Sequence, residues 1–285
     1  MGIRGNKAVW EAETFGFELL NVTVGDLIDQ QAKALPDKEA LVYHYPEIGL
    51  ELRLTYRQLR DEANRVAKGL MALGVEAGDK VAVLATNVPE WVLLEMALPK
   101  IGAVLVTVNT HYQQAELAYL LKQADVHTLV LMEEHRGNSY LRSLYGLLPE
   151  ITQLTDPARD RLRNDTFPSF RRAVLLGNRP QPGLLPFSQL AELGAGISDE
   201  ALALRQAQVA PDDVFQIQFT SGTTGAPKGA MITYRGTINN ARFVAARAGW
   251  TGDDRFVTAM PLFHTAGNVV DQLSMLVTGG TVIKA

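Results

Sequence analysis

Hydrophobic and polar residues along the chain follow two spacings, one typical of helices and one typical of strands. Between 55 and 74 the apolar residues recur every three or four positions, with Thr55 placed to cap a helix and Gly74 placed to end it. Short apolar runs instead predict buried strands. These runs fall at 80–84, 103–108, 127–132 and 173–176. The predicted strands therefore follow one another along the chain with helical segments between them.

The helical segments between these strands determine the fold class that we expect. One begins at 87–91, where Pro89 and Glu90 suit a first helical turn, and others span 114–123 and 139–148. Strands that alternate with helices in this way form mostly parallel β-sheets flanked by helices. The sequence therefore predicts an α/β fold, and we expect it to have two lobes. The first lobe covers about 76–205, and the second combines about 20–75 with 206–285.

The stretch at 219–229 carries more candidate chemistry than the rest of the chain. A predicted strand at 214–219 precedes it, and a helical pattern over 230–248 follows it. A strand, a glycine-rich loop and a helix in this order are a common place for a chain of phosphate groups to be held. The sequence therefore predicts a phosphate-binding loop here.

The residue types of this loop fit an anionic ligand. Gly222, Gly225 and Gly229 can adopt positive φ, which lets backbone N–H groups approach an anion closely. Pro227 restricts the backbone before Lys228, whose ammonium suits phosphate oxygens. Hydroxyl donors come from Thr220, Ser221, Thr223 and Thr224.

Two other interpretations of the loop were open. A surface turn uses the same residue types, although a string of this length favours a phosphate site. A Walker A loop requires Gly-Lys-Ser/Thr, whereas Lys228 follows Pro227 and precedes Gly229. The failed Walker pattern disfavours a phosphotransferase of the P-loop type.

The string Thr-Ser-Gly-Thr-Thr-Gly-x-Pro-Lys-Gly at 220–229 resembles the phosphate loop of the adenylate-forming (AMP-binding) enzymes, a family that includes the acyl-CoA synthetases. The resemblance implies that the loop holds the β- and γ-phosphates of ATP, with Thr220 against Mg²⁺. It also implies catalytic roles for Lys228 and Thr223. The ATP-binding residues that it implies are Thr220, Ser221, Gly222, Thr223, Thr224, Gly225, Ala226, Pro227 and Lys228.

Other segments extend the resemblance over about residues 20–285. Leu54-Thr-Tyr-Arg-Gln-Leu and Asn87-Val-Pro-Glu-Trp are similar to segments of the family's first sheets, and Pro261-Leu-Phe-His resembles the element that follows its phosphate loop. The resemblance implies that His264 lies beside the carboxylate and acyl pocket, with a catalytic role. The alternative is a histidine at a helix start that is satisfied by backbone carbonyls.

Several features that look like motifs are interpreted as structural. The Thr-Gly-Asp tripeptide at 251–253 stands where the family has a polar turn, not where it has its ribose-binding aspartate. The remaining histidines share no metal-ligand spacing, and they are His44, His111, His127 and His135.

Composition changes this picture little. The 285 residues are 47% hydrophobic, which is enough for a sizeable core, and a net charge of −4 gives no reason to expect nucleic-acid binding. The absence of cysteine excludes disulfides and thiolate chemistry. No signal peptide or membrane span is expected, so we predict a cytoplasmic protein that binds small molecules, with a homo-oligomer allowed.

The reaction implied by the resemblance is that of an AMP-forming acyl-CoA synthetase, in which ATP, a carboxylic acid and CoA give acyl-CoA, AMP and pyrophosphate. Family members are much longer and carry a second part of the nucleotide site and a C-terminal domain with a catalytic lysine. Neither occurs here. We therefore expect a truncated N-terminal part that is inactive alone, with a non-catalytic nucleotide- or acyl-binding module as the alternative.

The substrate that we expect is a medium- or long-chain fatty acid. An amino-acid substrate needs a counter-charge for its buried ammonium, and the segment 261–267 contains no acidic residue. Asp271 is expected to lie away from the pocket. Aryl acids need no counter-charge either, so an aryl-acid CoA ligase is the other branch left open.

Overall fold

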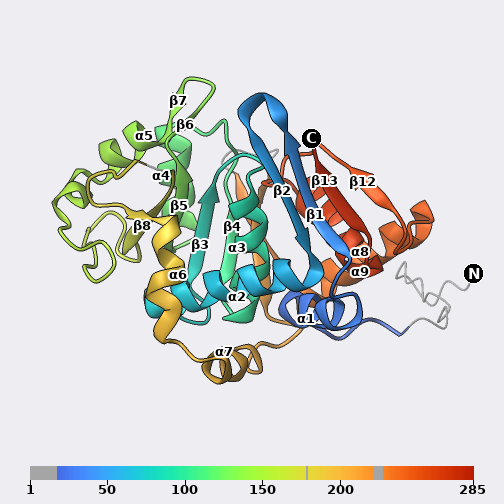
Figure 1. Cartoon of the computed structure of the whole chain (residues 1–285). Helices are drawn as coiled ribbons and strands as arrows, with labels where there is room; N and C mark the ends of the chain where they lie inside the picture. The colour runs from blue at the N-terminus through green and yellow to red at the C-terminus, as the bar shows by residue number, and fades with distance from the viewer. Residues whose placement is uncertain (1–17, 178, 221–226) are drawn as a thin grey trace, which may run out of the picture.

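The computed structural model describes residues 18–177, 179–220 and 227–285. Within these ranges the larger sheet has seven strands in the order β11-β10-β4-β3-β5-β8-β9 (Figure 1). All neighbours in it are parallel except β10 and β11. Its strands are β3 (Lys80–Leu84), β4 (Val104–Thr107), β5 (Val126–Met132), β8 (Arg172–Leu176), β9 (Leu185–Pro186), β10 (Val214–Thr220) and β11 (Lys228–Thr233).

A second sheet joins the beginning and the end of the described chain. Its order is β12-β13-β1-β2, and β13 is parallel to both β12 and β1, while β2 is antiparallel to β1. The strands of this four-stranded sheet are β1 (Glu39–Tyr45), β2 (Leu50–Thr55), β12 (Arg255–Val257) and β13 (Thr281–Lys284). A short hairpin of β6 (Glu134–His135) and β7 (Asn138–Ser139) stands apart from both sheets.

Helices cover both faces of the seven-stranded sheet. The helices of the described ranges, some of which pack on other helices or on the four-stranded sheet, are α1 (Val24–Ala34), α2 (Tyr56–Ala72), α3 (Pro89–Lys100), α4 (Gln114–Gln123), α5 (Tyr140–Leu147), α6 (Leu190–Leu193), α7 (Asp199–Gln206), α8 (Tyr234–Ala248), the π-helix Ala266–Leu273 and α9 (Ser274–Thr278). Short 3₁₀ turns occupy Pro46–Ile48, Pro149–Gln153, Phe187–Gln189 and Gly194–Gly196. As predicted, Thr55 caps α2, and its hydroxyl and the Gln58 side chain form a reciprocal capping box. No helix in the described ranges is long and apolar enough to cross a membrane.

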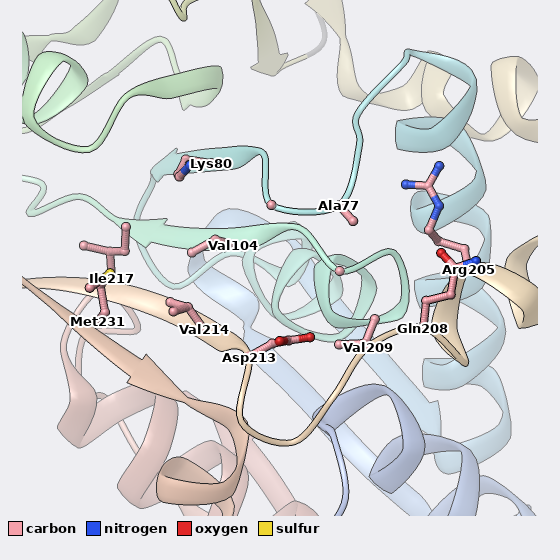
Figure 2. Close-up of a pocket in the computed structure, with 12 residues that line it drawn as sticks. Ala77, Lys80, Val104, Arg205, Gln208, Val209, Asp213, Val214, Ile217 and Met231 are labelled. Carbon is pink, nitrogen blue, oxygen red and sulfur yellow. The ribbon is translucent and has the colours of Figure 1, made fainter.

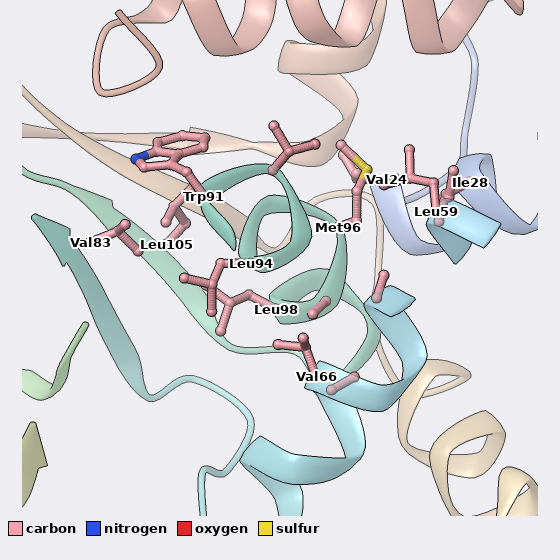
Figure 3. Packing of buried hydrophobic residues seen from close by; sticks show 14 of the residues in the cluster. Val24, Ile28, Leu59, Val66, Val83, Trp91, Leu94, Met96, Leu98 and Leu105 are labelled. Atoms are coloured by element: carbon pink, nitrogen blue, oxygen red, sulfur yellow. The ribbon is translucent and has the colours of Figure 1, made fainter. Parts of the chain in front are cut away.

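The main hydrophobic cluster gathers around α3, which is apolar on nearly all sides. This cluster includes side chains from both sheets, whereas α4 and α5 pack on the other face of the seven-stranded sheet in a second cluster. Figure 3 shows Trp91, Leu94, Met96 and Leu98 of α3 beside Val24 and Ile28 of α1, Leu59 and Val66 of α2, and Val83 and Leu105 of the sheet. The two sheets are therefore held together through α3.

The predicted fold class is confirmed, because most strand pairs are parallel and helices cover the sheets. The division into lobes stays a prediction. The sheets themselves divide the chain differently from those lobes, since β10 pairs with β4 and joins the seven-stranded sheet.

The helix predicted over 230–248 is wrong in its first turn. Residues up to Thr233 form β11, which pairs with β10 in an antiparallel register that brings Thr220 opposite Lys228. Helix α8 begins only at Tyr234, because the Thr233 hydroxyl accepts the Gly236 N–H and caps it there. The glycine-rich loop therefore joins two strands of a hairpin and does not lead directly into a helix N-terminus.

Candidate functional site

Strands β10 and β11 form one edge pair of the seven-stranded sheet and flank the glycine-rich segment in the chain. Strand β10 runs parallel to β4, with Gln218 beside Thr107, so the carboxyl ends of both strands lie at the same edge. The order of the strands reverses at β3, which has β4 on one side and β5 on the other. Ligands of open α/β sheets commonly bind at such a carboxyl edge, next to the point of reversal. The topology therefore places Thr220 at the end of β10, and Lys228 opposite it, where a ligand site is expected.

Three of the predicted ATP-binding residues fall in the described ranges. Thr220 ends β10 and is exposed, and Lys228 is an exposed residue of β11 that makes no ion pair with any described residue. The carbonyl of Pro227 accepts a hydrogen bond from the Tyr119 hydroxyl of α4 at 2.9 Å. The other predicted residues lie outside the described residues, and they are Ser221, Gly222, Thr223, Thr224, Gly225 and Ala226.

Gly229 has a different role from the one predicted. Its φ is not positive, because it lies within β11. A Cβ atom at this position would stand 2.9 Å from Cγ2 of Ile217, on the neighbouring strand. The glycine is therefore explained by close packing within the hairpin, and not by a left-handed backbone.

His264 lies in an exposed turn that leads into the π-helix. Its own N–H donates to the carbonyl of Pro261 at 3.1 Å, and the Ala266 N–H donates to its Nδ1 at 3.1 Å. Because Nδ1 accepts this bond, the proton of the neutral ring is assigned to Nε2. The histidine therefore offers an Nε2–H donor at the surface, and its ring is oriented by the local backbone.

Gly267 is necessary for this turn. A Cβ atom there would lie 2.3 Å from the carbonyl oxygen of Pro261 and 2.8 Å from that of Met260. Real Cβ atoms do not approach backbone oxygens so closely. The glycine lets the beginning of the π-helix fold back against the segment that precedes His264.

Three amide side chains that the sequence did not single out hold the same turn. Gln218 donates to the Phe263 carbonyl at 2.9 Å, Asn268 donates to the Leu262 carbonyl at 2.9 Å, and Asn87 accepts the Leu262 N–H at 2.9 Å. No signal in the sequence pointed to Gln218, because it alternates with apolar residues in the predicted strand, a pattern that favours an exposed polar face.

A groove of about 480 Å³ opens beside this turn at the carboxyl edge of β3, β4 and β5. Its lining includes Asn87 after β3, His111 after β4, Met132 at the end of β5, and Phe263. His135 and Arg136 also line it, so two of the histidines interpreted as structural face a cavity next to the candidate site. Burial, with Arg136 and His111 nearby, lowers the pKa of His135.

Another groove, of about 490 Å³, lies near the opposite end of the sheet (Figure 2). Figure 2 shows Lys80 and Val104 where β3 and β4 begin, with Arg205 and Gln208 across from them. None of the predicted site residues lines this groove. The groove of about 480 Å³ is not lined by them either, but it includes Phe263, which directly precedes His264 in the chain, and it lies at the carboxyl edge of the sheet. It is therefore the better candidate for a reaction site.

Ionisable groups are buried behind the π-helix. Burial raises the pKa of Glu95 well above its usual range and lowers that of Lys284 to about 8, although Glu95 and Asp271 both favour the charged lysine. Asp271 accepts a hydrogen bond from Thr258, and burial raises its pKa. As predicted, Asp271 does not belong to the surface on which His264 lies, because it is buried against β12 and β13.

The tripeptide at 251–253 forms an ordinary turn. The Thr251 N–H donates to Asp254 at 2.7 Å, and the Asp253 N–H donates to the Thr251 hydroxyl at 3.2 Å. These local bonds agree with its interpretation as a structural turn.

Comparison with known proteins assigns a family to this arrangement. The model of the family described as AMP-binding enzyme matches residues 28–285. A putative acyl-CoA synthetase, YngI, from Bacillus subtilis (strain 168) is 39% identical over 266 residues, which are 93% of this chain and 47% of the relative. The mitochondrial medium-chain acyl-CoA ligase ACSF2 of Bos taurus is 34% identical over 275 residues, which are 94% of this chain and 43% of the relative. The chain thus spans less than half the length of these curated relatives.

Solved structures share the fold. The anthranilate CoA ligase AuaEII, in complex with anthranoyl-AMP, superposes with a TM-score of 0.75 at 24% identity, over 93% of this chain and 45% of that one. A putative long-chain-fatty-acid CoA ligase from Rhodopseudomonas palustris CGA009 has a TM-score of 0.70 at 27% identity, over 93% of this chain and 57% of that one.

Proposed function

The chain belongs to the family of AMP-binding enzymes, and from that premise we propose that it is part of an AMP-forming acyl-CoA synthetase. One observation carries the proposal: the strand that leads into the phosphate loop is hydrogen-bonded to the turn that presents His264. This bond supports a common site for the end of β10 and the turn of His264, next to a groove of about 480 Å³ that includes Phe263. We propose that the ATP phosphates and the carboxylic acid meet at this edge of the sheet.

In the proposed reaction, the acid is first activated by ATP. A carboxylate oxygen attacks the α-phosphorus, the bond to the β-phosphate oxygen breaks, and pyrophosphate leaves. The CoA sulfur then attacks the acyl carbon of the adenylate, its proton is released, and AMP leaves. Such reactions depend on positioning and on neutralising phosphate charge.

The residues proposed for the first step are those of the loop. Lys228 is exposed and has no ionic partner among the described residues, so its ammonium is free to pair with phosphate oxygens. Thr223 and the remaining loop residues are proposed to donate hydrogen bonds to the β- and γ-phosphates. His264 is proposed to donate from Nε2 to the carboxylate of the acid.

Thr220 fits a magnesium ion that takes most of its ligands from the nucleotide. Mg²⁺ in such sites is held by one or two protein oxygens, by phosphates and by water, and Thr220 offers one exposed hydroxyl at the end of β10. When bound, the ion neutralises phosphate charge. Thr220 itself orients its hydroxyl from a strand that is fixed on both sides by β4 and β11.

The acid is proposed to be a medium- or long-chain fatty acid. The turn at His264 is followed by small residues, and the nearest acidic residue of the π-helix, Asp271, is bonded to Thr258 inside the protein. No described carboxylate of that helix is available to pair with a substrate ammonium. The ligase ACSF2 is named for medium-chain acids, which supports the shorter end of the range.

The proposal is tested by the full-length protein of which this chain is part. Purified protein is incubated with ATP, Mg²⁺ and CoA, and pyrophosphate release is measured across fatty acids, cinnamate-type acids and amino acids. Release that depends on a fatty acid supports the proposal, and preference for a cinnamate-type acid identifies an aryl-acid CoA ligase. Binding of nucleotide without release under any condition identifies a non-catalytic module.

Three further expectations rest on the same family. We propose that residues 1–285 show no turnover alone, which the same assay on the isolated chain checks. We propose a cytoplasmic location, to be checked by cell fractionation, although the ACSF2 relatives are named as mitochondrial. A homo-oligomer is proposed as the assembly, and light scattering on the purified protein decides it.

A further inference from the structure

A network of amide side chains connects the strand before the phosphate loop to the turn that carries His264. Gln218 of β10 donates from Nε2 to the Phe263 carbonyl at 2.9 Å. Asn268 of the π-helix donates to the Leu262 carbonyl at 2.9 Å, and its Oδ1 lies 3.5 Å from Nε2 of Gln216, which also belongs to β10. Gln218 therefore bonds directly to the carbonyl just before His264, and Gln216 is connected to the preceding carbonyl only through Asn268.

The position of this network in the protein is unusual for amide groups. Gln216 and Asn268 are completely buried, and Gln218 is 9% exposed. Burying an amide costs free energy unless its groups are hydrogen-bonded, and the Oε1 atoms of both glutamines have no partner in the described part of the chain. Apolar residues would fill the same space without this cost. The glutamines are therefore not explained by stability alone.

We propose that Gln218 is a positioning residue, which fixes the turn of His264 in relation to the strand that ends in the phosphate loop. Gln218 precedes Thr220, the first predicted loop residue, by two positions, and its bond ends on the residue just before His264. The inference deepens the proposed function and rests on it for the meaning of the turn as a site. It assigns a role to a side chain that lies outside both sequence motifs.

The bond also bears on the state of the histidine ring. Gln218 holds the Phe263 carbonyl just before His264, and just after it the Ala266 N–H donates to Nδ1 of His264. Without the Gln218 amide the Phe263 carbonyl has no hydrogen-bond donor in the part of the chain that the structure describes, and the backbone of the turn moves so that the carbonyl can accept from another group. The Ala266 bond then weakens, and the preference for the proton on Nε2 falls with it.

The test compares two substitutions that remove a polar group from the same buried layer. Gln218→Met keeps the length of the side chain and removes its donor. Thr107→Val is the matched control, because Thr107 is the neighbour of Gln218 on β4, is 2% exposed, and has a hydroxyl without a hydrogen-bond partner among the described residues. Both variants are made in the full-length protein, with melting temperature measured for each.

Two readouts are used, and one of them does not require activity. Adenylate formation is measured as acid-dependent pyrophosphate release, with kcat and the KM for ATP determined separately. The tautomer of His264 is followed by ¹⁵N NMR of protein labelled at histidine, with a His264→Gln sample to assign its signals.

We expect Gln218→Met to lower kcat about tenfold, which corresponds to the free energy of about one hydrogen bond, with the KM for ATP unchanged. The spectrum is expected to show loss of the single Nε2–H tautomer, and Thr107→Val is expected to resemble the wild type in both.

The outcomes separate this inference from the proposed function. If the wild-type protein forms no adenylate with any acid, the proposed function fails, and the histidine spectrum alone decides the role of Gln218. If Gln218→Met resembles Thr107→Val in both kcat and the spectrum, the positioning role is overturned. A fall in kcat that is matched by a fall in melting temperature, with an unchanged tautomer, also overturns it, because the side chain would then be structural.

Discussion

Two buried layers beside α3 differ in the chemistry of their side chains: one is aliphatic, and the other contains polar and charged groups. Where α3 meets α1 and α2, the side chains are aliphatic, and Leu94, Met96 and Leu98 are completely buried. Where the π-helix meets β10 and β13, the buried side chains include Gln216, Asn268 and Lys284, all without solvent exposure. Burial is equally complete in both layers, so it does not distinguish them. The polar layer gives up stabilisation that the apolar layer retains.

Two buried lysines make the difference more specific. Lys100 at the end of α3 reaches Asp29 at 2.6 Å and Gln206 at 3.2 Å. Lys284 of β13 has no hydrogen-bond partner among the described residues, and it lies near Glu95, whose carboxylate oxygens are also unpaired. Lys100 is therefore a hydrogen-bonded structural group, whereas the burial cost of Lys284 is compensated only in part, by Glu95 and Asp271 nearby. The polar layer lies directly behind the turn of His264. The free-energy cost of burying these polar side chains therefore arises next to the candidate site.

The largest expected effect comes from the apolar layer. We expect Leu94→Ala to lower the free energy of unfolding by about 2–5 kcal/mol, because it opens a cavity around a fully buried residue. Leu204→Ala is the control, since this leucine of α7 is 70% exposed, and its replacement is expected to change stability by less than about 0.5 kcal/mol. Denaturant unfolding measures both, and equal effects would show that α3 does not organise the core.

Lys228→Ala should do the reverse and change activity with little change in stability. The ammonium is exposed and unpaired, so its removal leaves no cavity and no orphaned partner in the described chain. We expect the rate of pyrophosphate release by the full-length protein to fall by about 100-fold, which corresponds to about 2.7 kcal/mol of transition-state stabilisation. A variant that releases pyrophosphate at the wild-type rate would remove Lys228 from the mechanism.

Gly267→Ala tests the turn itself. The added Cβ would contact the Pro261 carbonyl at 2.3 Å, so the turn must move, at a cost of about 1–3 kcal/mol. Gly196→Ala is the matched control, because a Cβ there has open space and the backbone φ is not positive. Thermal unfolding and the KM for the acid are measured in both variants. Wild-type values for Gly267→Ala would show that the close approach is not required.

The smallest expected effect is a dependence of stability on pH through Lys284. Its pKa is about 8 in the folded protein and 10.5 for an ordinary lysine, so between these values the unfolded chain binds more protons than the folded one. The stability of the wild type therefore rises with pH across this window, while below it the cost of the buried charge is present in full.

The comparison with Lys284→Met measures this effect together with its coupling to Glu95. Glu95 acts in the opposite direction, since its raised pKa makes the folded form lose stability as pH rises, and the charge of Lys284 lowers the pKa of Glu95. We expect the wild type to gain stability relative to Lys284→Met between about pH 8 and pH 10.5. A difference that is constant with pH would mean that Lys284 is not held in a state of lowered pKa.

The sequence by itself determined the α/β class and the start of α2, and it predicted a phosphate-binding segment at 219–229, which stays a prediction. These features depend on local spacing, on caps such as Thr55, and on a string of residues whose chemistry is visible without a partner. It also separated the turn at 251–253 from the chemistry, because the bonds of that turn are local.

Only the tertiary structure decided that a strand follows the loop, and which side chains form hydrogen bonds to the turn of His264. Residues 230–233 form a strand because β10 is there to pair with them, and their own pattern does not reveal that partner. Gln218 and Asn87 reach the turn across 45 and 175 positions of the chain. Hydrogen bonds between residues so far apart are made by the packing of sheets and helices, whereas sequence spacing reports only the neighbours along one strand or one helix.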